Sequence, residues 1–377
     1  MNRCSLHRRQ SGIALILVTI GALALLGMAG LALDMGMAYI AKSRLQNAVD
    51  AAALDGAKVL NDTGSVSAAT TAALATFGTN MGGTSATATV QTSPTLQPFS
   101  AGAANPRFVR VSVGALPVAV RLARVLPGVG DSLDIGASAV AGPIPLGDTV
   151  CDALPVALCG TPGDTDCTDG SCFGFAAGTT DELELKGDNV SLTHGNYGLV
   201  ELSCGTGAAC VRDGLAGGHE VCFSQSGTIT TEPGVKAGPT RQGLDTRFGI
   251  YNGPVSAAEY PPDVVTTYSP VIFHSTYEAR LTSPASWNYT SPPGRPQRRV
   301  TVIPVIDCSV PITGRSEVPL IGGACLFLTR PVSTSGGSIY GQLVPTCEAA
   351  GAVAEDPDPD SAYYRIILYR DASSTQS

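Results

Sequence analysis

The feature that most constrains this chain is an uncharged apolar segment close to its N-terminus. Gly12–Leu33 holds 22 residues without a charge. At about 1.5 Å per residue, a helix of this length spans the ~30 Å hydrocarbon core of a bilayer. Arg3, Arg8 and Arg9 precede the segment and Asp34 follows it. Because basic flanks stay in the cytoplasm, we expect a single-pass inner-membrane protein with a cytoplasmic N-terminus and a periplasmic body.

Two other interpretations of this segment remain open. A cleaved secretory signal needs small residues at its cleavage site, which Gly30 and Ala32 supply, although its apolar region is usually only about 7–15 residues long. A prepilin-type leader would be cleaved at Gly12, but such substrates usually carry Glu where this chain has Leu17. The length of the segment favours an uncleaved anchor.

The composition outside the anchor is typical of secreted β-structure. Only 14% of the residues are charged, whereas the chain has 44 glycines and 26 prolines, which indicates many turns and small side chains. A net charge of −8 argues against nucleic acid as a partner, because phosphate binding needs clustered Lys and Arg. The length allows two or three domains.

Ten of the 11 cysteines lie in the second part of the chain, and Cys4 precedes the anchor. The ten are Cys151, Cys159, Cys167, Cys172, Cys204, Cys210, Cys222, Cys308, Cys325 and Cys347. An even set on the extracytoplasmic side predicts disulfides; zinc is disfavoured because no CxxC pair occurs, and free buried thiols are the other alternative. Short separation favours the pairs Cys167–Cys172, Cys204–Cys210 and Cys308–Cys325.

Residue periodicity predicts an α+β organisation in the first 145 residues. Good helix formers without proline continue the anchor into a stalk, so we expect one helix from about residue 12 to 60. A second helix is expected over 65–80, strands near 107–114 and 133–142, and a further helix over 117–128, which opens with proline. From residue 146 onward, short strand-like runs alternate with turns, which predicts a β-rich domain.

The N-terminal segment resembles that of TadG-like proteins of the tight-adherence (Tad/Flp) pilus system. The matching residues are Gly30, Ala32, Asp34, Gly36, Tyr39, Leu45–Ala48 and Asp50–Leu54. The resemblance covers the anchor and stalk over 1–60, with its span at 12–33. The residue patterns described above predict a small pilin-like α+β module over 61–145 and a β-rich disulfide-containing domain over 146–377. Many relatives carry a metal-dependent adhesion site with an Asp-x-Ser-x-Ser motif, which this sequence lacks.

The same resemblance implies a structural component of Tad/Flp pilus assembly that contacts other assembly proteins or pilins, and membrane lipid, through the helix. The candidate partner-binding residues are Gly27, Gly30, Asp34, Tyr39, Gln46, Ala48 and Asp50. An acid at the end of an apolar helix can meet a partner's amine or helix N-terminus, or it can be a solvated charge. Small residues let membrane helices approach closely, but they are also common in lone spans.

No residue pattern in this chain nominates an enzyme, a cofactor site or a metal site. His194, His219 and His274 are scattered, and no GxSxG or HExxH motif accompanies them, so we expect structural or surface histidines. Asp356, Asp358 and Asp360 do not resemble a known calcium loop. We expect Trp287 and Tyr363–Tyr364 to pack in the core rather than to form a binding patch. The alternatives are a minor pilin in the fibre, or an anchored envelope hydrolase or carbohydrate-binding protein.

Overall fold

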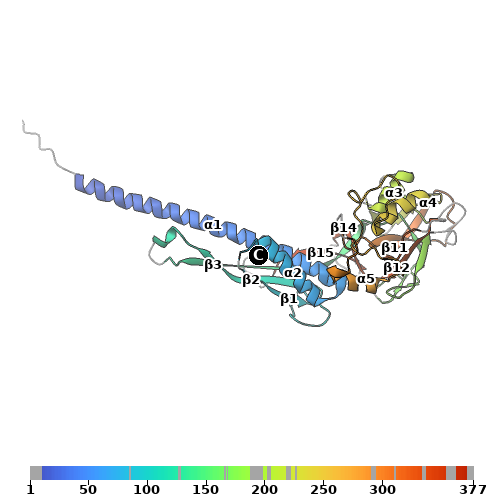
Figure 1. Cartoon of the computed structure of the whole chain (residues 1–377), viewed down its shortest axis with the longest axis horizontal. Helices are drawn as coiled ribbons and strands as arrows, with labels where there is room; N and C mark the ends of the chain where they lie inside the picture. The colour runs from blue at the N-terminus through green and yellow to red at the C-terminus, as the bar shows by residue number, and fades with distance from the viewer. Residues whose placement is uncertain are drawn as a thin grey trace, which may run out of the picture. The chain divides into compact units, whose positions relative to one another are not determined.

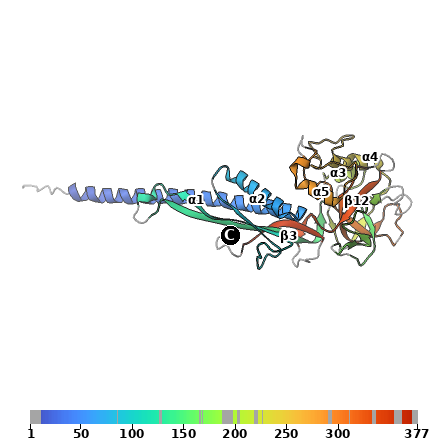
Figure 2. The same ribbon diagram turned by 60° about the horizontal axis from the view of Figure 1, so that its bottom comes forward.

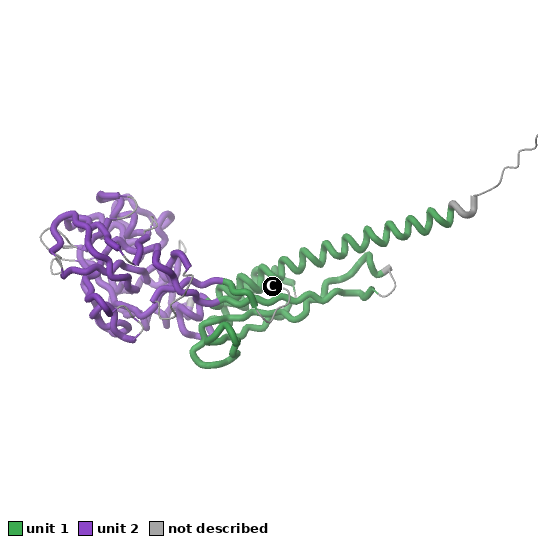
Figure 3. Tube along the Cα trace, turned by 180° about the vertical axis from the view of Figure 1, so that it is seen from behind, with its two compact units in different colours: residues 1–57, 69–141, 368–377 green, residues 58–68, 142–367 purple. Residues whose placement is uncertain are grey.

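A computed structural model gives the fold of the chain (Figure 1). It describes residues 11–84, 86–125, 129–164, 167, 169–186, 198–201, 205–217, 222–225, 227–289, 294–309, 311–332, 337–353 and 362–371. The chain forms two compact units (Figure 3), the first from residues 1–57, 69–141 and 368–377 and the second from 58–68 and 142–367. The fold class is α+β, as expected, with a long apolar helix and a β-rich disulfide-containing body.

The first unit is built on one long helix that lies along a β-hairpin (Figures 1 and 2). Its elements are α1 (Ser11–Thr63), α2 (Val66–Met81), β1 (Thr89–Ser93), β2 (Phe108–Ala119), η1 (Ala123–Val125) and the first part of β3 (Ser132–Cys151). Strands β1, β2 and β3 form an antiparallel sheet. The expected stalk helix and the expected helix over 65–80 are both present, as α1 and α2.

Small side chains allow α1 to lie close to both α2 and the sheet. A Cβ added at Gly56 of α1 would lie 3.0 Å from the Cβ of Ala73 in α2 and 3.2 Å from Cγ1 of Val109 in β2. On β2, Val109, Val111 and Val113 are buried, and the residues between them are less so. The alternation therefore gives the inward-facing strand that the sequence predicts.

The helix expected over 117–128 is wrong. Strand β2 continues to Ala119, which pairs with Ser132 of β3, and the described residues of the connection contain only the short 3-10 turn η1. The pairing with β3 provides the backbone with hydrogen-bond partners, and the β-branched Val118 suits an extended chain. Pro117 is tolerated because β1 pairs only with residues 108–112, which leaves Pro117 on an edge of the sheet.

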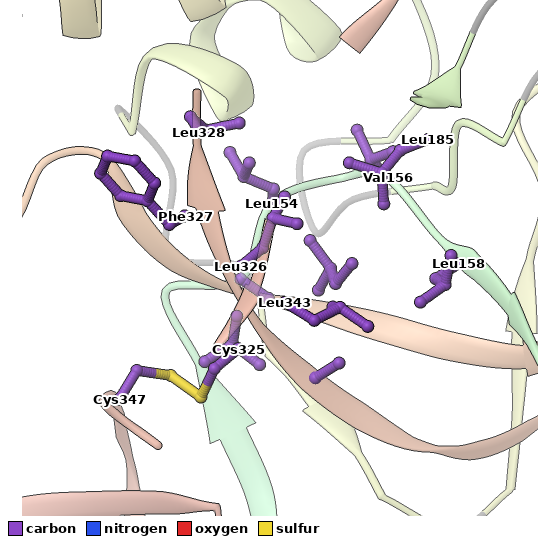
Figure 4. Packing of buried hydrophobic residues seen from close by; sticks show 14 of the residues in the cluster. Leu154, Val156, Leu158, Leu185, Cys325, Leu326, Phe327, Leu328, Leu343 and Cys347 are labelled. Carbon is purple, nitrogen blue, oxygen red and sulfur yellow. A yellow bond between two sulfur atoms is a disulfide. The ribbon is translucent and has the colours of Figure 1, made fainter. Parts of the chain in front are cut away.

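The second unit contains a six-stranded sheet in which β4, β10, β11, β12 and β7 are neighbours in that order and β9 also pairs with β11. These strands are β4 (Leu158–Gly160), β7 (Leu183–Lys186), β9 (Gly227–Thr230), β10 (Val300–Asp307), β11 (Glu317–Leu328) and β12 (Ile339–Val344). Their buried side chains form the main core, which includes Leu154, Leu326 and Leu343 (Figure 4).

The remaining elements of the second unit are short. They are β5 (Ser171–Cys172), β6 (Phe175–Ala176), β8 (Phe223–Ser224), β13 (Cys347–Glu348), β14 (Ala350–Val353), β15 (Tyr363–Tyr369), α3 (Ala208–Ala216), α4 (Ala237–Leu244), η2 (Asp245–Phe248), α5 (His274–Leu281) and η3 (Pro284–Ser286). Helices α3 and α4 approach closely, since a Cβ at Gly243 would lie 2.1 Å from the carbonyl oxygen of Arg212. The sequence did not predict these helices.

A buried arginine connects several segments of the second unit. The Arg299 guanidinium donates to the carbonyl oxygens of Leu328, Val265, Thr267 and Thr329 at 2.9–3.1 Å. The rings of Phe248 and Phe327 lie 4.7 and 4.6 Å from its central carbon. Since buried carbonyl oxygens need hydrogen-bond donors, the Arg299 side chain stabilises the backbone of these segments.

Four disulfides in which both cysteines are among the described residues lie in the second unit: Cys151–Cys222, Cys159–Cys308, Cys167–Cys172 and Cys325–Cys347 (the last in Figure 4). The expected pair Cys167–Cys172 is confirmed. The expected pair Cys308–Cys325 is wrong, because the antiparallel register of β10 and β11 places Cys325 opposite Val302 rather than near Cys308. The expected pair Cys204–Cys210 includes Cys204, which lies outside the described residues.

Non-reducing peptide mapping of protein from the periplasm should recover Cys159 linked to Cys308. This bond joins residues that are 149 positions apart in the sequence. Without it, the unfolded chain has a much higher conformational entropy, which favours unfolding. Replacing both cysteines by serine should lower the free energy of unfolding by about 2–5 kcal/mol. Recovery of Cys159 and Cys308 as free thiols in the folded protein would contradict this pairing.

Candidate functional site

The first half of α1 presents apolar side chains that the first unit does not cover. Side chains from Leu15 to Ile40 include many large apolar groups that are 43–75% exposed. By length and composition, α1 is a helix that can cross a membrane. The exposed apolar surface continues past the uncharged segment to Tyr39 and Ile40, so it is longer than the span expected at 12–33.

Asp34 is bound within the chain, at the tip of the β2–β3 hairpin. Its carboxylate accepts hydrogen bonds from the backbone N–H groups of Arg121, Leu122 and Ala123 at 3.1, 2.8 and 2.6 Å. These amides begin η1, so the acid is at a short helical N-terminus, where a negative charge is favourable. Asp34 is consequently buried, with 7% of its surface exposed.

The small residues beside Asp34 allow this contact. Gly30 is buried, and a Cβ there would lie 2.9 Å from the Cβ of Leu122. Ala38, one turn beyond Asp34, is also buried. Positions 30, 34 and 38 lie on one face of the helix because residues four apart are neighbours. This face carries the hairpin tip, and we define the three residues Gly30, Asp34 and Ala38 as the hairpin seat.

The other candidate partner-binding residues lie in different surroundings. Tyr39 is 75% exposed, Gly27 is half-buried and Ala48 is fully buried. The Gln46 amide donates to Asp50 Oδ1 at 2.8 Å and to the carbonyl oxygen of Ser138 in β3 at 3.1 Å. Burial raises the pKa of Asp50 above its ordinary value, and the hydrogen bond from Gln46 only partly opposes this shift. Among these residues, only Tyr39 is exposed.

Two polar contacts between α1 and α2 were not among the candidates. Arg44 donates to the carbonyl oxygens of Asn80 and Met81, at 3.3 and 2.9 Å, and so binds the C-terminal end of α2. The Thr76 hydroxyl donates to Asp55 at 2.6 Å. A cation at a helix C-terminus is favourable. The sequence signal for the Arg44 contact was a basic residue beside the alanine-rich stripe of the stalk helix.

The second unit contains a polar cavity of about 1000 Å³. Asp62, His274, Glu278, Gln297 and Arg298 are among the residues that line it. Burial, together with the negative charge of the nearby Asp62, raises the pKa of Glu278 to about 7. Burial also raises the pKa of Asp62 to about 6, while Lys58 opposes the shift and Glu348 adds to it. Two carboxyl groups in this cavity therefore titrate close to neutral pH.

His274 packs against aromatic rings of the second unit. Burial lowers its pKa to about 4, so the imidazole is neutral at physiological pH. Its ring stacks on Tyr277 and meets Phe327 edge-on, and its backbone N–H donates to Gln342 at 2.7 Å. His194 and His219, like Asp356, Asp358 and Asp360, lie outside the described residues. Within the described ranges, no group of three or more His, Cys, Asp or Glu side chains is placed to hold a metal ion.

The aromatic residues follow the expected core packing. Tyr363 and Tyr364 are each 4% exposed, and Trp287 packs against the main core of the second unit. Burial raises the pKa of Tyr363 well above its ordinary value, and the hydrogen bond with the backbone of Gly323 opposes that shift. These rings therefore contribute to stability rather than to an accessible binding patch.

Thermal unfolding should depend on pH through Glu278. Its folded-state pKa is raised to about 7, so the folded state binds more protons than the unfolded state below that value, and stability falls as pH rises from about 4.5 to 7. His274 has the opposite sign, since its lowered pKa reduces stability as pH falls below about 6.5. Glu278→Gln should raise the Tm by about 2–4 °C at pH 8 and change it less at pH 5.

The matched control for this comparison is Glu317→Gln, because Glu317 is exposed at the start of β11. Its Tm difference from the unmodified protein should be the same at both pH values. An equal Tm difference at pH 5 and pH 8 for Glu278→Gln would contradict the buried, proton-binding state of this carboxyl group.

Comparison with known proteins finds a match for the N-terminal part of the chain. Residues 12–76 match the family model described as "Putative Flp pilus-assembly TadE/G-like", and this segment of the chain is TadE/G-like. The match covers α1 and most of α2, which include the hairpin seat. No curated protein matches the chain. No solved structure matches it either.

Proposed function

We propose that this protein is a non-enzymatic, membrane-anchored component of Flp/Tad pilus assembly. The observation that carries the proposal is that the TadE/G-like match falls on α1, the helix whose apolar side chains from Leu15 to Ile40 are exposed. A helix with this surface needs a bilayer or other apolar helices around it.

The orientation that we propose places the second unit outside the cytoplasm. Its disulfides are typical of an oxidising compartment, and the arginines before the apolar segment favour a cytoplasmic N-terminus. In this arrangement α1 contacts pilins or other assembly proteins within or near the membrane. Tyr39 is the exposed candidate residue for such contacts.

A deletion strain tests this function. Loss of the gene should abolish surface pili, and the full chain should restore them while the protein remains in the inner-membrane fraction after alkaline washing. If the protein is instead recovered in pili sheared from the cells, it is a minor pilin packed in the fibre. Normal piliation in the deletion strain would contradict a role in assembly.

A substitution at His274 distinguishes the proposed structural function from the alternative of an anchored hydrolase. His274→Gln should leave piliation at the level of the unmodified protein, because its imidazole packs between rings and its pKa near 4 makes it a poor base at neutral pH. Pili would be counted at matched protein levels. Loss of pili with normal accumulation of the variant would favour the hydrolase alternative.

A further inference from the structure

The hairpin seat fixes the tip of the β2–β3 hairpin at a defined level along α1. Leu122 lies against Gly30, and Asp34 binds the amides of residues 121–123. Gly30 is three residues before Leu33, the end of the uncharged segment. At about 1.5 Å per residue, Leu122 is therefore at a level ~5 Å inside that end. Where α1 spans a bilayer over residues 12–33, the tip reaches the boundary between headgroups and acyl chains.

The side chains at the tip suit this boundary. Leu122 is 48% exposed, Leu133 44% and Val129 38%. On the neighbouring turns of α1, Leu33, Met37 and Tyr39 are more than half exposed. Large apolar groups from the helix and from the hairpin thus occur at the same level of the first unit, and a tyrosine is typical of the membrane–water interface.

The charges at the tip indicate which kind of lipid contact is expected. Arg124 pairs with Asp131 at 3.1 Å, and both side chains are exposed. Arg121 and Asp134 are also exposed. The positive charges of these two arginines and the negative charges of these two aspartates cancel, so the electrostatic attraction of the tip to anionic headgroups is small. The three apolar side chains provide the driving force, at about 25 cal/mol per Å² removed from water.

We propose that the tip of the β2–β3 hairpin, with Leu122, Val129 and Leu133 as its apolar contacts, inserts into the interface of the same bilayer that α1 spans. This inference rests on the proposed anchoring of α1. Insertion by about 5–10 Å is the depth at which amphipathic elements lie in the headgroup region. Asp34 tolerates this depth because three backbone N–H groups solvate its charge in place of water.

Tryptophan fluorescence of the full chain in phosphatidylcholine vesicles tests this insertion. Trp287, the one native tryptophan, is first replaced by Phe. Single tryptophans are then introduced as Leu122→Trp and Leu133→Trp, with Ala103→Trp as the control. Ala103 is exposed and lies before β2, at the other end of that strand from the tip. Lipids brominated along the acyl chain quench tryptophans that enter the bilayer.

We expect blue-shifted emission and at least twofold stronger quenching at positions 122 and 133 than at position 103, with the same result when phosphatidylglycerol is added. Water-like emission without quenching at both tip positions, in protein that floats with the vesicles, would overturn the insertion but leave the anchor intact. Quenching only in vesicles with phosphatidylglycerol would overturn the apolar mechanism. Failure of the chain to float with the vesicles would overturn the anchor, and the insertion with it.

Discussion

Asp34→Ala is expected to abolish surface pili while the protein still accumulates. The substitution removes the acceptor for the N–H groups of Arg121, Leu122 and Ala123. Each buried amide left without an acceptor costs about 1–3 kcal/mol, so the hairpin tip should separate from α1. The measurement is the number of pili on a deletion strain that expresses the variant at the level of the unmodified protein.

Asp34→Asn is the matched control, since its amide oxygen can still accept from one or two of these N–H groups. We expect it to retain more pili than Asp34→Ala. Hydrogen exchange at the amides of residues 121–123 provides a second readout, because it should accelerate in Asp34→Ala and remain slow in the unmodified chain. Normal pili and slow exchange in Asp34→Ala would show that the seat is not needed.

Arg299→Met should lower the free energy of unfolding of the second unit by about 3–5 kcal/mol. The side chain is fully buried and donates to four backbone carbonyl oxygens. Methionine has a comparable length but no donor, so these buried carbonyls lose their donor. The buried carboxyl group of Asp263 keeps its hydrogen bonds but loses a nearby positive charge. Chemical denaturation, followed by fluorescence of the single tryptophan, measures the change.

The control for Arg299→Met is Arg315→Met. Arg315 pairs with Glu201, but half of its side chain is exposed, and an exposed ion pair contributes only about 0–1 kcal/mol. Its loss should therefore leave the denaturation midpoint nearly unchanged. A midpoint for Arg299→Met that equals that of Arg315→Met would contradict the account of the buried arginine.

Local patterns were sufficient to predict α1, α2 and parts of strands β2 and β3. The apolar run and the proline-free stalk predicted α1, and the alternation of Val109, Val111 and Val113 predicted β2. The prediction of a helix over 117–128 was wrong. The proline and leucines of this segment suit a helix locally, whereas pairing with β3 extends β2 to Ala119. Tertiary pairing overrides local propensity in such segments.

Long-range partners could not be predicted from one sequence. Asp34 was selected as a candidate by its position at the end of the apolar run, but its bonded amides are 87–89 residues away. Cys159 and Cys308 are 149 residues apart, and only the pairing of β4 with β10 brings them together. Short separation, the basis of the expected cysteine pairs, identifies local bonds such as Cys167–Cys172 and misses those set by the sheet.

The proposed function requires that α1 anchors this protein in the membrane for pili to assemble. The most direct measurement is the number of surface pili on a deletion strain that expresses a chain in which residues 1–33 are replaced by a cleavable secretory signal. The anchoring account predicts a soluble periplasmic protein, with its disulfides formed, and no pili. Pili at the level of the unmodified protein, produced by this soluble form, would contradict it.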